Sequence, residues 1–433
     1  MDYLEFWNRF SQAEQKADVF TIQTIGYQLY PMLRTRLYYQ LAQELGIFDN
    51  PHPNAETKSE LEVPNLNHLV SHSAQTVVVP FVRKVGSEDV YSRPFVDALG
   101  SSTRLLTHQE LAEVRSYGKN KFDGFVYEAM LKEKKRDVRE RWAQMAKVFQ
   151  EELGVGLGKF DQFPNWLVRR YIGECLAYKE LFSNLGTKKV FIVNAYSHPS
   201  LVVGAKQAGA KVIEIQHGFI SEYHPAYHYP KIRIQSAPNV LLTWGDYWVK
   251  AANYPKGMRA KTVGPPTNYL LARAGFQSKA SEKTILFSSQ GAIGKTLLAE
   301  AINWAKQLGD YQITFRLHPN EDLAEYQKHK LPANLTLSHK DPSFISVMQS
   351  HRYLVGGFST TLYEAMGFGL RAIALRLPGV ENLSAAISRG DLAVADLGLG
   401  AKEIIKLLES ASPAQNPYSY YAKEFNVKVA LRA

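Results

Sequence analysis

The stretch that decides the fold reads HRYLVGGFSTTLYEAMGFGLRAIALRL and covers residues 351–377. It opens with a short apolar run that ends at two glycines, continues with apolar residues at helical spacing, and closes with a second apolar run. We predict a strand over 351–357, a helix over 361–369 and a strand over 371–377. A strand–helix–strand unit of this kind places its two strands in parallel, as in an α/β sheet.

The same alternation continues outward from this unit. Further strands are predicted at 240–245, 260–266, 284–291, 311–319 and 334–339, with helices at 293–307, 321–329 and 342–350. An earlier unit has strands at 189–194 and 212–215 around a helix at 200–209. Steady alternation of strands and helices is typical of a doubly wound parallel sheet.

The N-terminal half carries a helical elaboration. Residues 1–50 have apolar side chains at helical spacing, and residues 111–182 are charged and largely helical. We therefore predict an α/β fold of two domains, over 1–235 and 236–412, with a tail over 413–433. The cleft between the two domains is the expected site.

The charge of the chain points to anionic ligands. The 433 residues carry a formal net charge of +10, which attracts phosphorylated ligands, anionic lipid or nucleic acid. Acidic residues interrupt the densest basic run, Lys132–Arg141, so we interpret it as a solvated helix face; a patch on an anionic membrane is the alternative. No spacing typical of a nucleic-acid-binding motif is present, so nucleic acid is not an expected partner.

The sequence also predicts the compartment. The single cysteine, Cys175, allows no disulfide within the chain, which fits a reducing environment. The N-terminal residues lack the pattern of a signal peptide, and no apolar run reaches the length of a membrane span. We expect a cytoplasmic protein that is soluble or peripheral to a membrane.

Ser359 and Thr360 stand where the helix of the opening stretch should begin. The N–H groups and the dipole of a helix N-terminus favour phosphate, and the two hydroxyls add donors. Glu364 lies about one turn further on, where a carboxylate can accept hydrogen bonds from ribose hydroxyls. The structural alternative is a Ser/Thr helix cap with a solvated glutamate.

Arg316, His318 and Pro319 close the strand predicted at 311–319. A histidine at the end of a strand, fixed by the following proline, can donate to a phosphate oxygen. Arg316 adds charge, although the alternation of side chains along a strand can turn it away. The alternative is a capped strand end with an incidental histidine.

The loop SSQGAIGKT, at 288–296, resembles a P-loop because it joins a strand to a helix and ends in GKT. A P-loop requires glycine where this chain has Ser289, and no strand ending in Asp supplies the magnesium partner. We therefore interpret Gln290, Gly291 and Lys295 as groups that meet a phosphorylated ligand without forming a true P-loop.

The motif Gln216-His217-Gly218 ends the strand predicted at 212–215. Glycine allows a sharp turn that presents the His217 ring to the cleft, and histidine suits acid–base chemistry near neutral pH. A role as a phosphate donor or loop-structuring group is the alternative. Glu222 and Glu214 are the competing carboxylates, and Glu222 is the stronger because Glu214 falls inside the strand.

Asn194, His198 and His224 lie in the loops that follow the two strands at 189–194 and 212–215, where they are expected to contact a second substrate. The histidines of 217–228 would suit a metal if two shared a helical face, but Pro225 argues against a helix there. No Asp-x-Asp sequence, which holds a divalent cation and a diphosphate in some transferases, occurs in the chain. We expect no metal and no cofactor.

Several of these motifs resemble those of a known family. Residues 351–377 resemble the donor-binding segment of GT-B glycosyltransferases. The runs VLLTWGDYWVK and KTVGPPTN resemble the start of the C-terminal domain in enzymes of bacterial surface-polysaccharide (lipopolysaccharide and capsule) assembly. The pairs His318-Pro319 and Ser359-Thr360 are similar to motifs of bacterial sialyltransferases and polysialyltransferases, with related pairs in Kdo transferases and teichoic-acid polymerases. The resemblance covers about 190–390.

The resemblance implies a GT-B fold, in which two Rossmann-like domains face each other across a cleft. It implies that His318, Ser359 and Thr360 hold the phosphate of a nucleotide-sugar donor, and that His217 or Glu222 deprotonates the acceptor hydroxyl. The implied reaction transfers a sugar, with a CMP-linked acidic sugar favoured, to a bacterial surface glycan or glycolipid at the inner membrane. It is expected to need no metal and to invert the anomeric centre.

Three other functions stay open. A sugar-nucleotide 2-epimerase and a polyol-phosphate transferase use the same fold. A non-enzymatic protein that binds anionic ligands would also explain the net charge. The sialyltransferase pattern often has two serines where this chain has Ser359 and Thr360. The threonine leaves the identity of the donor open.

Overall fold

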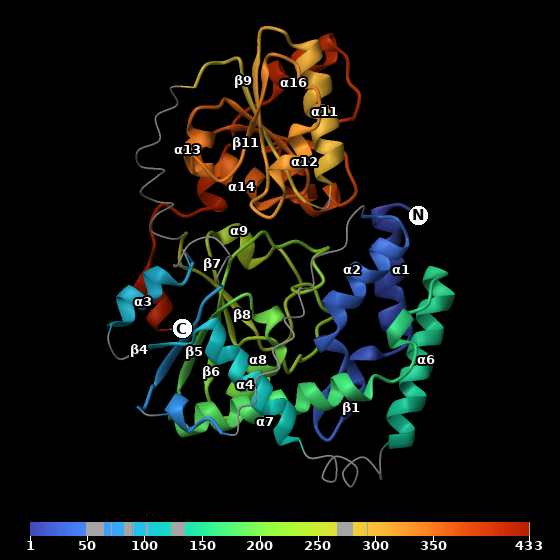
Figure 1. The fold of residues 1–433 in the computed structure, drawn as a ribbon, viewed down its shortest axis with the longest axis vertical. Helices are drawn as coiled ribbons and strands as arrows, with labels where there is room; N and C mark the ends of the chain where they lie inside the picture. Colours follow the sequence, from blue (N-terminus) through green and yellow to red (C-terminus); the bar gives the residue numbers. More distant parts are fainter. Residues whose placement is uncertain are drawn as a thin grey trace.

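The computed structural model describes residues 1–48, 65–70, 72–81, 89, 91–100, 103–122, 135–265, 280–291 and 293–432. It consists of two α/β domains stacked along the long axis of the molecule, each built on a six-stranded parallel sheet (Figure 1). The predicted fold class, two Rossmann-like domains with a helical elaboration in the N-terminal half, is confirmed.

The C-terminal sheet has the strand order β11–β10–β9–β12–β13–β14, and all its pairs are parallel. Its strands are β9 (Thr284–Ser288), β10 (Gln312–Arg316), β11 (Leu335–Ser338), β12 (Tyr353–Gly356), β13 (Arg371–Leu375) and β14 (Ala393–Ala395). Its helices are α11 (Gly294–Gln307), α12 (Leu323–Gln327), α13 (Phe344–Gln349), α14 (Thr360–Gly367), α15 (Ser384–Ser388) and α16 (Ala401–Ser410). The order reverses between β9 and β12, so the crevice for a ligand lies beyond the carboxyl ends of these two strands.

The N-terminal sheet has the order β4–β3–β5–β6–β7–β8, again with parallel pairs. Its strands are β3 (Thr76–Val79), β4 (Thr103–Leu105), β5 (Lys189–Val193), β6 (Lys211–Ile215), β7 (Val240–Thr243) and β8 (Arg259–Thr262). Helices α4 (His108–Lys121), α7 (Asn165–Asn184) and α8 (Pro199–Gln207) pack on one another against the sheet. The order reverses between β3 and β5, which places a second crevice at that edge.

Strand pairing corrects the predicted domain boundary. The sequence pattern predicts the runs at 240–245 and 260–266 in the C-terminal domain, but β7 pairs with β6 and β8 pairs with β7 in the N-terminal sheet. The two sheets are therefore separated between Thr262 and Thr284. The cause is that alternation of strands and helices predicts a parallel sheet without specifying which of two consecutive sheets a strand joins.

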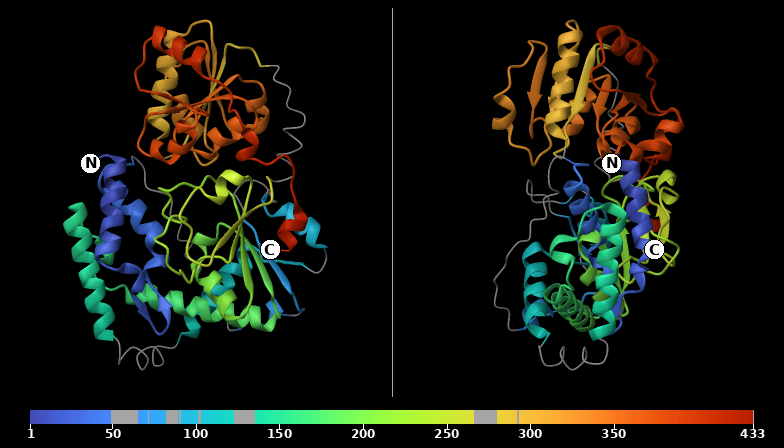
Figure 2. Two further views of the ribbon diagram at one scale, coloured as in Figure 1. Left: turned by 180° about the vertical axis from the view of Figure 1, so that it is seen from behind. Right: turned by 90° about the vertical axis from the view of Figure 1, so that its right-hand side faces the viewer.

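The predicted helix over 1–50 is also wrong in its middle part. Helices α1 (Tyr3–Lys16) and α2 (Arg34–Glu44) are separated by an antiparallel hairpin of β1 (Gln23–Thr24) and β2 (Tyr27–Gln28). Ile25 and Gly26 form its turn with positive φ, which ends the helical pattern there. Helix α1 packs against α6 (Lys135–Leu153), and both stand beside the N-terminal sheet (Figure 2).

The segment after 413 returns to the N-terminal domain. Figure 1 shows the red chain leaving the C-terminal domain and ending beside α3 (Arg93–Leu99), which α17 (Val427–Leu431) contacts. The Trp248 indole donates to the Tyr420 carbonyl at 2.7 Å. A Cβ on Gly245 would lie 2.6 Å from the Tyr420 backbone, so the glycine of the WG sequence is what lets the segment pass.

Gly264 has the same function at the next crossing. Its φ of +92° suits glycine, and a Cβ there would lie 2.8 Å from the carbonyl carbon of Glu424. The WG and VG sequences therefore belong to the end of the N-terminal sheet and its contact with the returning segment, rather than to the start of the C-terminal domain.

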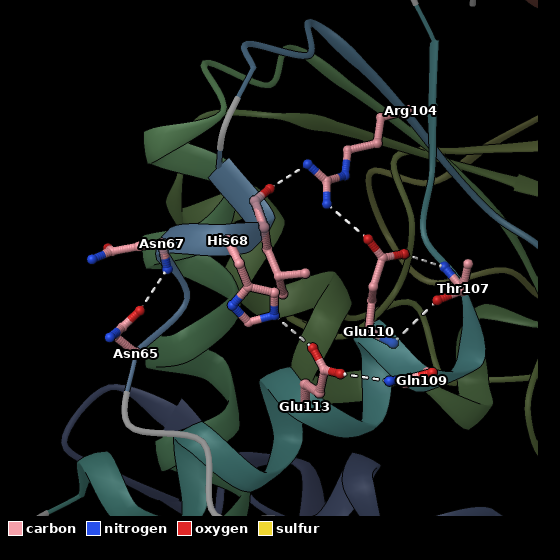
Figure 3. Close-up of polar contacts among 9 residues, drawn as sticks. Asn65, Asn67, His68, Arg104, Thr107, Gln109, Glu110 and Glu113 are labelled. Carbon is pink, nitrogen blue, oxygen red and sulfur yellow. Dashed lines mark hydrogen bonds and ion pairs between the residues drawn. The ribbon is translucent and has the colours of Figure 1, made fainter.

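A polar cluster at the start of α4 fixes the edge of the N-terminal sheet (Figure 3). Thr107 and Glu110 form a reciprocal capping box, and Glu110 also accepts from Arg104 of β4 at 2.8 Å. Glu113 accepts from the Gln109 amide at 3.1 Å and lies 2.8 Å from Nε2 of His68. These contacts join α4 to β4 and to the segment before β3, so the cluster stabilises this edge.

Candidate active site

The carboxyl edges of the two sheets face each other. The segment after β6 contacts the segment after β12, where Phe219 N donates to Thr360 Oγ1 at 3.1 Å. It also contacts the segment after β13, where Ser221 Oγ donates to Asn382 Oδ1 at 2.6 Å. Both crevices therefore open toward the junction of the domains, as the interpretation of a cleft site requires.

The crevice of the C-terminal domain is lined by the ends of β9 and β12. A Cβ on Gly357 would lie 3.2 Å from Gln290 Oε1 and would overlap the Ile293 side chain, so only glycine fits against this loop. Gln290 Oε1 is buried, and no described residue donates a hydrogen bond to it. This buried acceptor beside the crevice is an exception to the rule that buried polar atoms are hydrogen-bonded.

Ser359 and Thr360 begin α14, as predicted. Ser359 is the N-cap, and its Oγ accepts from the N–H and the hydroxyl of Thr361, at 3.3 and 3.1 Å. The Thr360 hydroxyl faces the other domain, where it accepts from Phe219 N. Ser359 thus caps the helix and Thr360 contacts the other domain. Both lie at a helix N-terminus, which favours the binding of phosphate. Glu364 lies half-buried one turn into the helix.

His318 and Pro319 lie exposed after β10, next to the end of β9. His318 Nδ1 accepts from Asn320 N at 3.2 Å, which fixes the ring orientation. Arg316 is buried and donates to Ser338 Oγ at 2.8 Å and to the carbonyls of two residues after β11. Burial lowers the pKa of Arg316, and its hydrogen bonds are those of a group that holds the β11 loop.

A carboxylate side chain, that of Glu321, is hydrogen-bonded to the P-loop-like segment at 288–296. Glu321 accepts from His318 N at 2.6 Å, from Ser289 Oγ at 2.9 Å and from the Tyr326 hydroxyl. A Cβ on Gly294, the first residue of α11, would overlap Glu321 and the Tyr326 hydroxyl. The Glu321 carboxyl group therefore lies against the first residue of α11, where a negative charge opposes the binding of a phosphate. Gly291 and Lys295 lie exposed beside it.

His217 lies in an aromatic surrounding at the edge of the N-terminal sheet. The rings of Phe81, Tyr91 and Tyr196 lie 5.7, 6.5 and 5.8 Å from its own, and the Tyr196 hydroxyl is 3.3 Å from Nε2. The Gln216 amide fixes the turn, because its nitrogen donates to Gly218 O and its oxygen accepts from Trp244 N, both at 2.9 Å. The imidazole is partly exposed and held in one orientation.

The carboxylates near His217 differ in environment. Glu222 is exposed on the loop after β6. Glu214 is buried within β6, where Oε1 accepts from Ala195 N at 3.1 Å and from the Tyr227 hydroxyl at 2.9 Å. Burial raises the pKa of Glu214 to about 7, although both hydrogen bonds lower it.

The three residues predicted to contact a second substrate have different surroundings. Asn194 ends β5 in a left-handed conformation, and its Oδ1 accepts from Ser197 Oγ at 3.0 Å. His198 lies beside α4, where burial and the charge of Arg115 lower its pKa to about 4. His224 faces the junction of the domains, and its ring lies 5.7 Å from that of Tyr196.

A small cavity at the junction has His224 in its wall. The other lining residues are mostly aromatic and come from the N-terminal helices, the loop after β6 and the C-terminal domain: Tyr3, Tyr38, Tyr39, Phe48, Phe219, Tyr223, Pro225, Phe358 and Asn382. Asn382 donates to the Tyr3 hydroxyl at 2.9 Å. The N-terminal helices thus reach the junction, which the helical periodicity did not indicate.

Four groups at the site were not predicted from the sequence. The Gln216 side chain, Tyr196, Glu321 and Asn382 are fixed by hydrogen bonds across loops that are distant in sequence. Only Gln216 carried a signal, because it belongs to the Gln216-His217-Gly218 motif. Within the described ranges, no three metal-ligating side chains come together, and no helix is long and apolar enough to cross a membrane.

Comparison with known proteins gives similarity of structure alone. No protein-family model and no curated protein matches the chain. MurG of Acinetobacter baumannii is similar at a TM-score of 0.42 and 12% identity, over 61% of this chain and 77% of that one. The glycosyltransferase SnogD of Streptomyces nogalater is similar at 0.43 and 13%, over 83% and 98%.

A Listeria monocytogenes protein assigned as a UDP-N-acetylglucosamine 2-epimerase is similar at a TM-score of 0.46 and 11% identity, over 80% of this chain and 94% of that one. The fold and site define a two-domain Rossmann-like protein with histidine, hydroxyl and amide groups gathered where its domains meet.

Proposed function

We propose that this protein is a glycosyltransferase that takes a sugar from a nucleotide donor and transfers it to an acceptor hydroxyl. The observation that carries the proposal is the contact of Phe219 N with Thr360 Oγ1. It brings the His217 turn of one domain against the Ser359-Thr360 helix start of the other. A base candidate and a phosphate-binding candidate thereby face one junction.

In the proposed reaction, the donor nucleotide occupies the crevice between β9 and β12. The acceptor oxygen forms a bond to the anomeric carbon while the bond from that carbon to the phosphate oxygen breaks. His217 takes the acceptor proton. The N-terminus of α14, with Ser359 and Thr360, and the His318 ring stabilise the negative charge on the departing phosphate.

The finer assignment rests on the motif pairs. The pairs His318-Pro319 and Ser359-Thr360 favour a CMP-linked acidic sugar, and the resemblance to surface-polysaccharide enzymes favours a bacterial glycan or glycolipid as acceptor. Histidine, hydroxyls and a helix N-terminus suffice to neutralise the leaving phosphate, so we propose transfer without a metal. The net charge of +10 suits both an anionic donor and peripheral contact with the inner membrane.

The test is thermal unfolding with CMP, CDP, UDP, GDP, dTDP and ATP, each with and without EDTA. A ligand that binds the folded state raises the midpoint in proportion to its affinity. We expect one nucleotide to act selectively, unaffected by EDTA, with the shift reduced in His318→Ala. His329→Ala, an exposed histidine of the same domain, is the matched control. A shift confined to ATP with magnesium would overturn the proposal.

A further inference from the structure

Glu214 is an exception in the pattern of the N-terminal sheet. It stands in the middle of β6, paired in register with Ile192 of β5 and Leu241 of β7, and it is 1% exposed. A carboxyl group in such a place costs stability unless its oxygens are hydrogen-bonded. Two hydrogen bonds to its Oε1 atom offset part of this cost.

The two hydrogen bonds of Glu214 reach two different loops. Ala195, whose N–H donates to Oε1 at 3.1 Å, belongs to the loop after β5. Tyr227, whose hydroxyl donates to the same oxygen at 2.9 Å, belongs to the loop after β6. One carboxyl oxygen thus ties together the loops that follow two neighbouring strands.

Each loop carries a group of the candidate active site next to the tied residue. Tyr196 follows Ala195, and its hydroxyl lies 3.3 Å from Nε2 of His217. The Tyr196 ring also packs on Tyr227 and His224, with centroids 5.6 and 5.7 Å away. A movement of either loop would therefore change the surroundings of His217 and His224 together.

We propose that Glu214 is a positioning residue, which fixes Tyr196 against His217 and His224 by holding the loops after β5 and β6 in register. The inference rests on the proposed function only in giving His217 a catalytic role; the positioning itself concerns the ring environments. The carboxyl contacts neither histidine in the described structure, so it acts through Ala195, Tyr196 and Tyr227.

The ionisation of Glu214 offers an independent handle on this arrangement. Burial raises its pKa to about 7. The titratable groups that face it are the phenols of Tyr196, Tyr227, Tyr229 and Tyr254. Burial raises the pKa of each phenol above its ordinary value. In the pH range of 6 to 8 these phenols stay neutral, so the carboxyl is the group of this set that changes charge.

The test uses the full chain with ¹³C-labelled histidine rings and NMR, after assignment of His217 and His224 by single substitution to Gln. Glu214→Leu removes the acceptor, and we expect the ring signals of both histidines to shift. Glu214→Gln keeps an oxygen that can accept both bonds. We expect it to retain the wild-type signals at pH 6 and to differ from the wild type at pH 8, where the wild-type carboxyl group is charged.

Glu300→Gln is the matched control, since Glu300 is a buried carboxylate of the other domain that accepts from Gly398 N at 2.9 Å. It should move neither signal. If Glu214→Leu does not fold, Tyr227→Phe removes one bond alone and should shift the His224 signal. A folded Glu214→Leu or Tyr227→Phe with unmoved histidine signals would overturn the inference. Nucleotide binding is measured separately, so failure of one proposal is distinguishable from failure of the other.

Discussion

Phe219 and Thr360 are joined by one hydrogen bond, 3.1 Å from the backbone nitrogen to the hydroxyl oxygen, although 141 residues separate them in the sequence. The bond links the loop after β6 to the start of α14, whose N-terminus is the candidate phosphate-binding site. It lies directly beside Gly218, where a Cβ would be 3.5 Å from the Thr360 hydroxyl oxygen, an ordinary contact distance. This contact, together with the hydrogen bond from Ser221 to Asn382, fixes the relative position of the two candidate motifs.

Thr360→Val should weaken this junction. The change preserves shape but leaves Phe219 N without its acceptor, which costs about 1–2 kcal/mol when a partly buried donor loses its partner. Thr360→Ser retains the hydroxyl and serves as the control. Urea unfolding followed by circular dichroism measures both. Equal free energies of unfolding for the two variants would contradict the role given to the hydroxyl.

Glu321→Gln should destabilise the C-terminal domain. The carboxylate accepts from the His318 backbone, Ser289 and Tyr326 at the start of α11, and a neutral amide weakens charge-assisted bonds by about 1–3 kcal/mol in total. Glu325→Gln is the control, because its pair with Lys328 is exposed and contributes less than about 1 kcal/mol. Thermal unfolding of the two variants tests this, and similar midpoints would refute it.

Gly264→Ala should be far more damaging than Gly209→Ala. Both glycines have positive φ, +92° and +83°, so both substitutions strain the backbone by about 1 kcal/mol. A Cβ at Gly209 meets open space, whereas one at Gly264 meets the backbone of Glu424. The difference between the free energies of unfolding lost in Gly264→Ala and in Gly209→Ala therefore measures the contact with the returning segment. We expect a further loss of about 1–3 kcal/mol, measured by urea unfolding.

The stability difference between Glu214→Gln and the wild type should depend on pH. The folded-state pKa of Glu214 is about 7, above its ordinary 4.5, so its stabilising contribution is complete below about pH 4.5. That contribution is lost as pH rises through 7, and the full loss is about 3 kcal/mol. Glutamine does not titrate, so the variant should gain on the wild type between pH 5 and 8. A difference that stays constant across this range would contradict the buried, uncharged state.

Cys175 should be unreactive in the folded protein. The thiol is fully buried on α7, and burial together with the neighbouring Glu174 charge raises its pKa well above the ordinary value. Reaction requires the thiolate. At pH 8 we expect no reaction with a thiol-specific chromogenic reagent in buffer and complete reaction in urea. Rapid labelling of the native chain would show that α7 opens far more readily than its burial indicates.

The sequence predicted the elements whose pattern is local. The strand, helix and second strand predicted within 351–377 appear as β12, α14 and β13, and His217 and Ser359 both follow the carboxyl ends of strands. Alternation and turn chemistry act within a few residues, which makes them readable in one dimension. The assignment of β7 and β8 failed because sheet membership depends on pairing with strands far away along the chain.

The candidate site was predictable to the same extent as the fold. The sequence indicates the residues of the motifs but not the groups that orient them. Tyr196 acquires its contact with His217 only when the loops after β5 and β6 are brought together. Arg316 looked like a ligand-binding charge, yet its hydrogen bonds go to the loop after β11, as the alternation of side chains along a strand allowed.

The returning segment has a consequence for how the chain is made. Trp244 and Trp248 of the N-terminal domain pack against Tyr421 and Tyr420, which the ribosome adds only after the whole C-terminal domain. During synthesis the whole sequence of the N-terminal sheet therefore exists before residues 420–421 are available to pack against these two indoles.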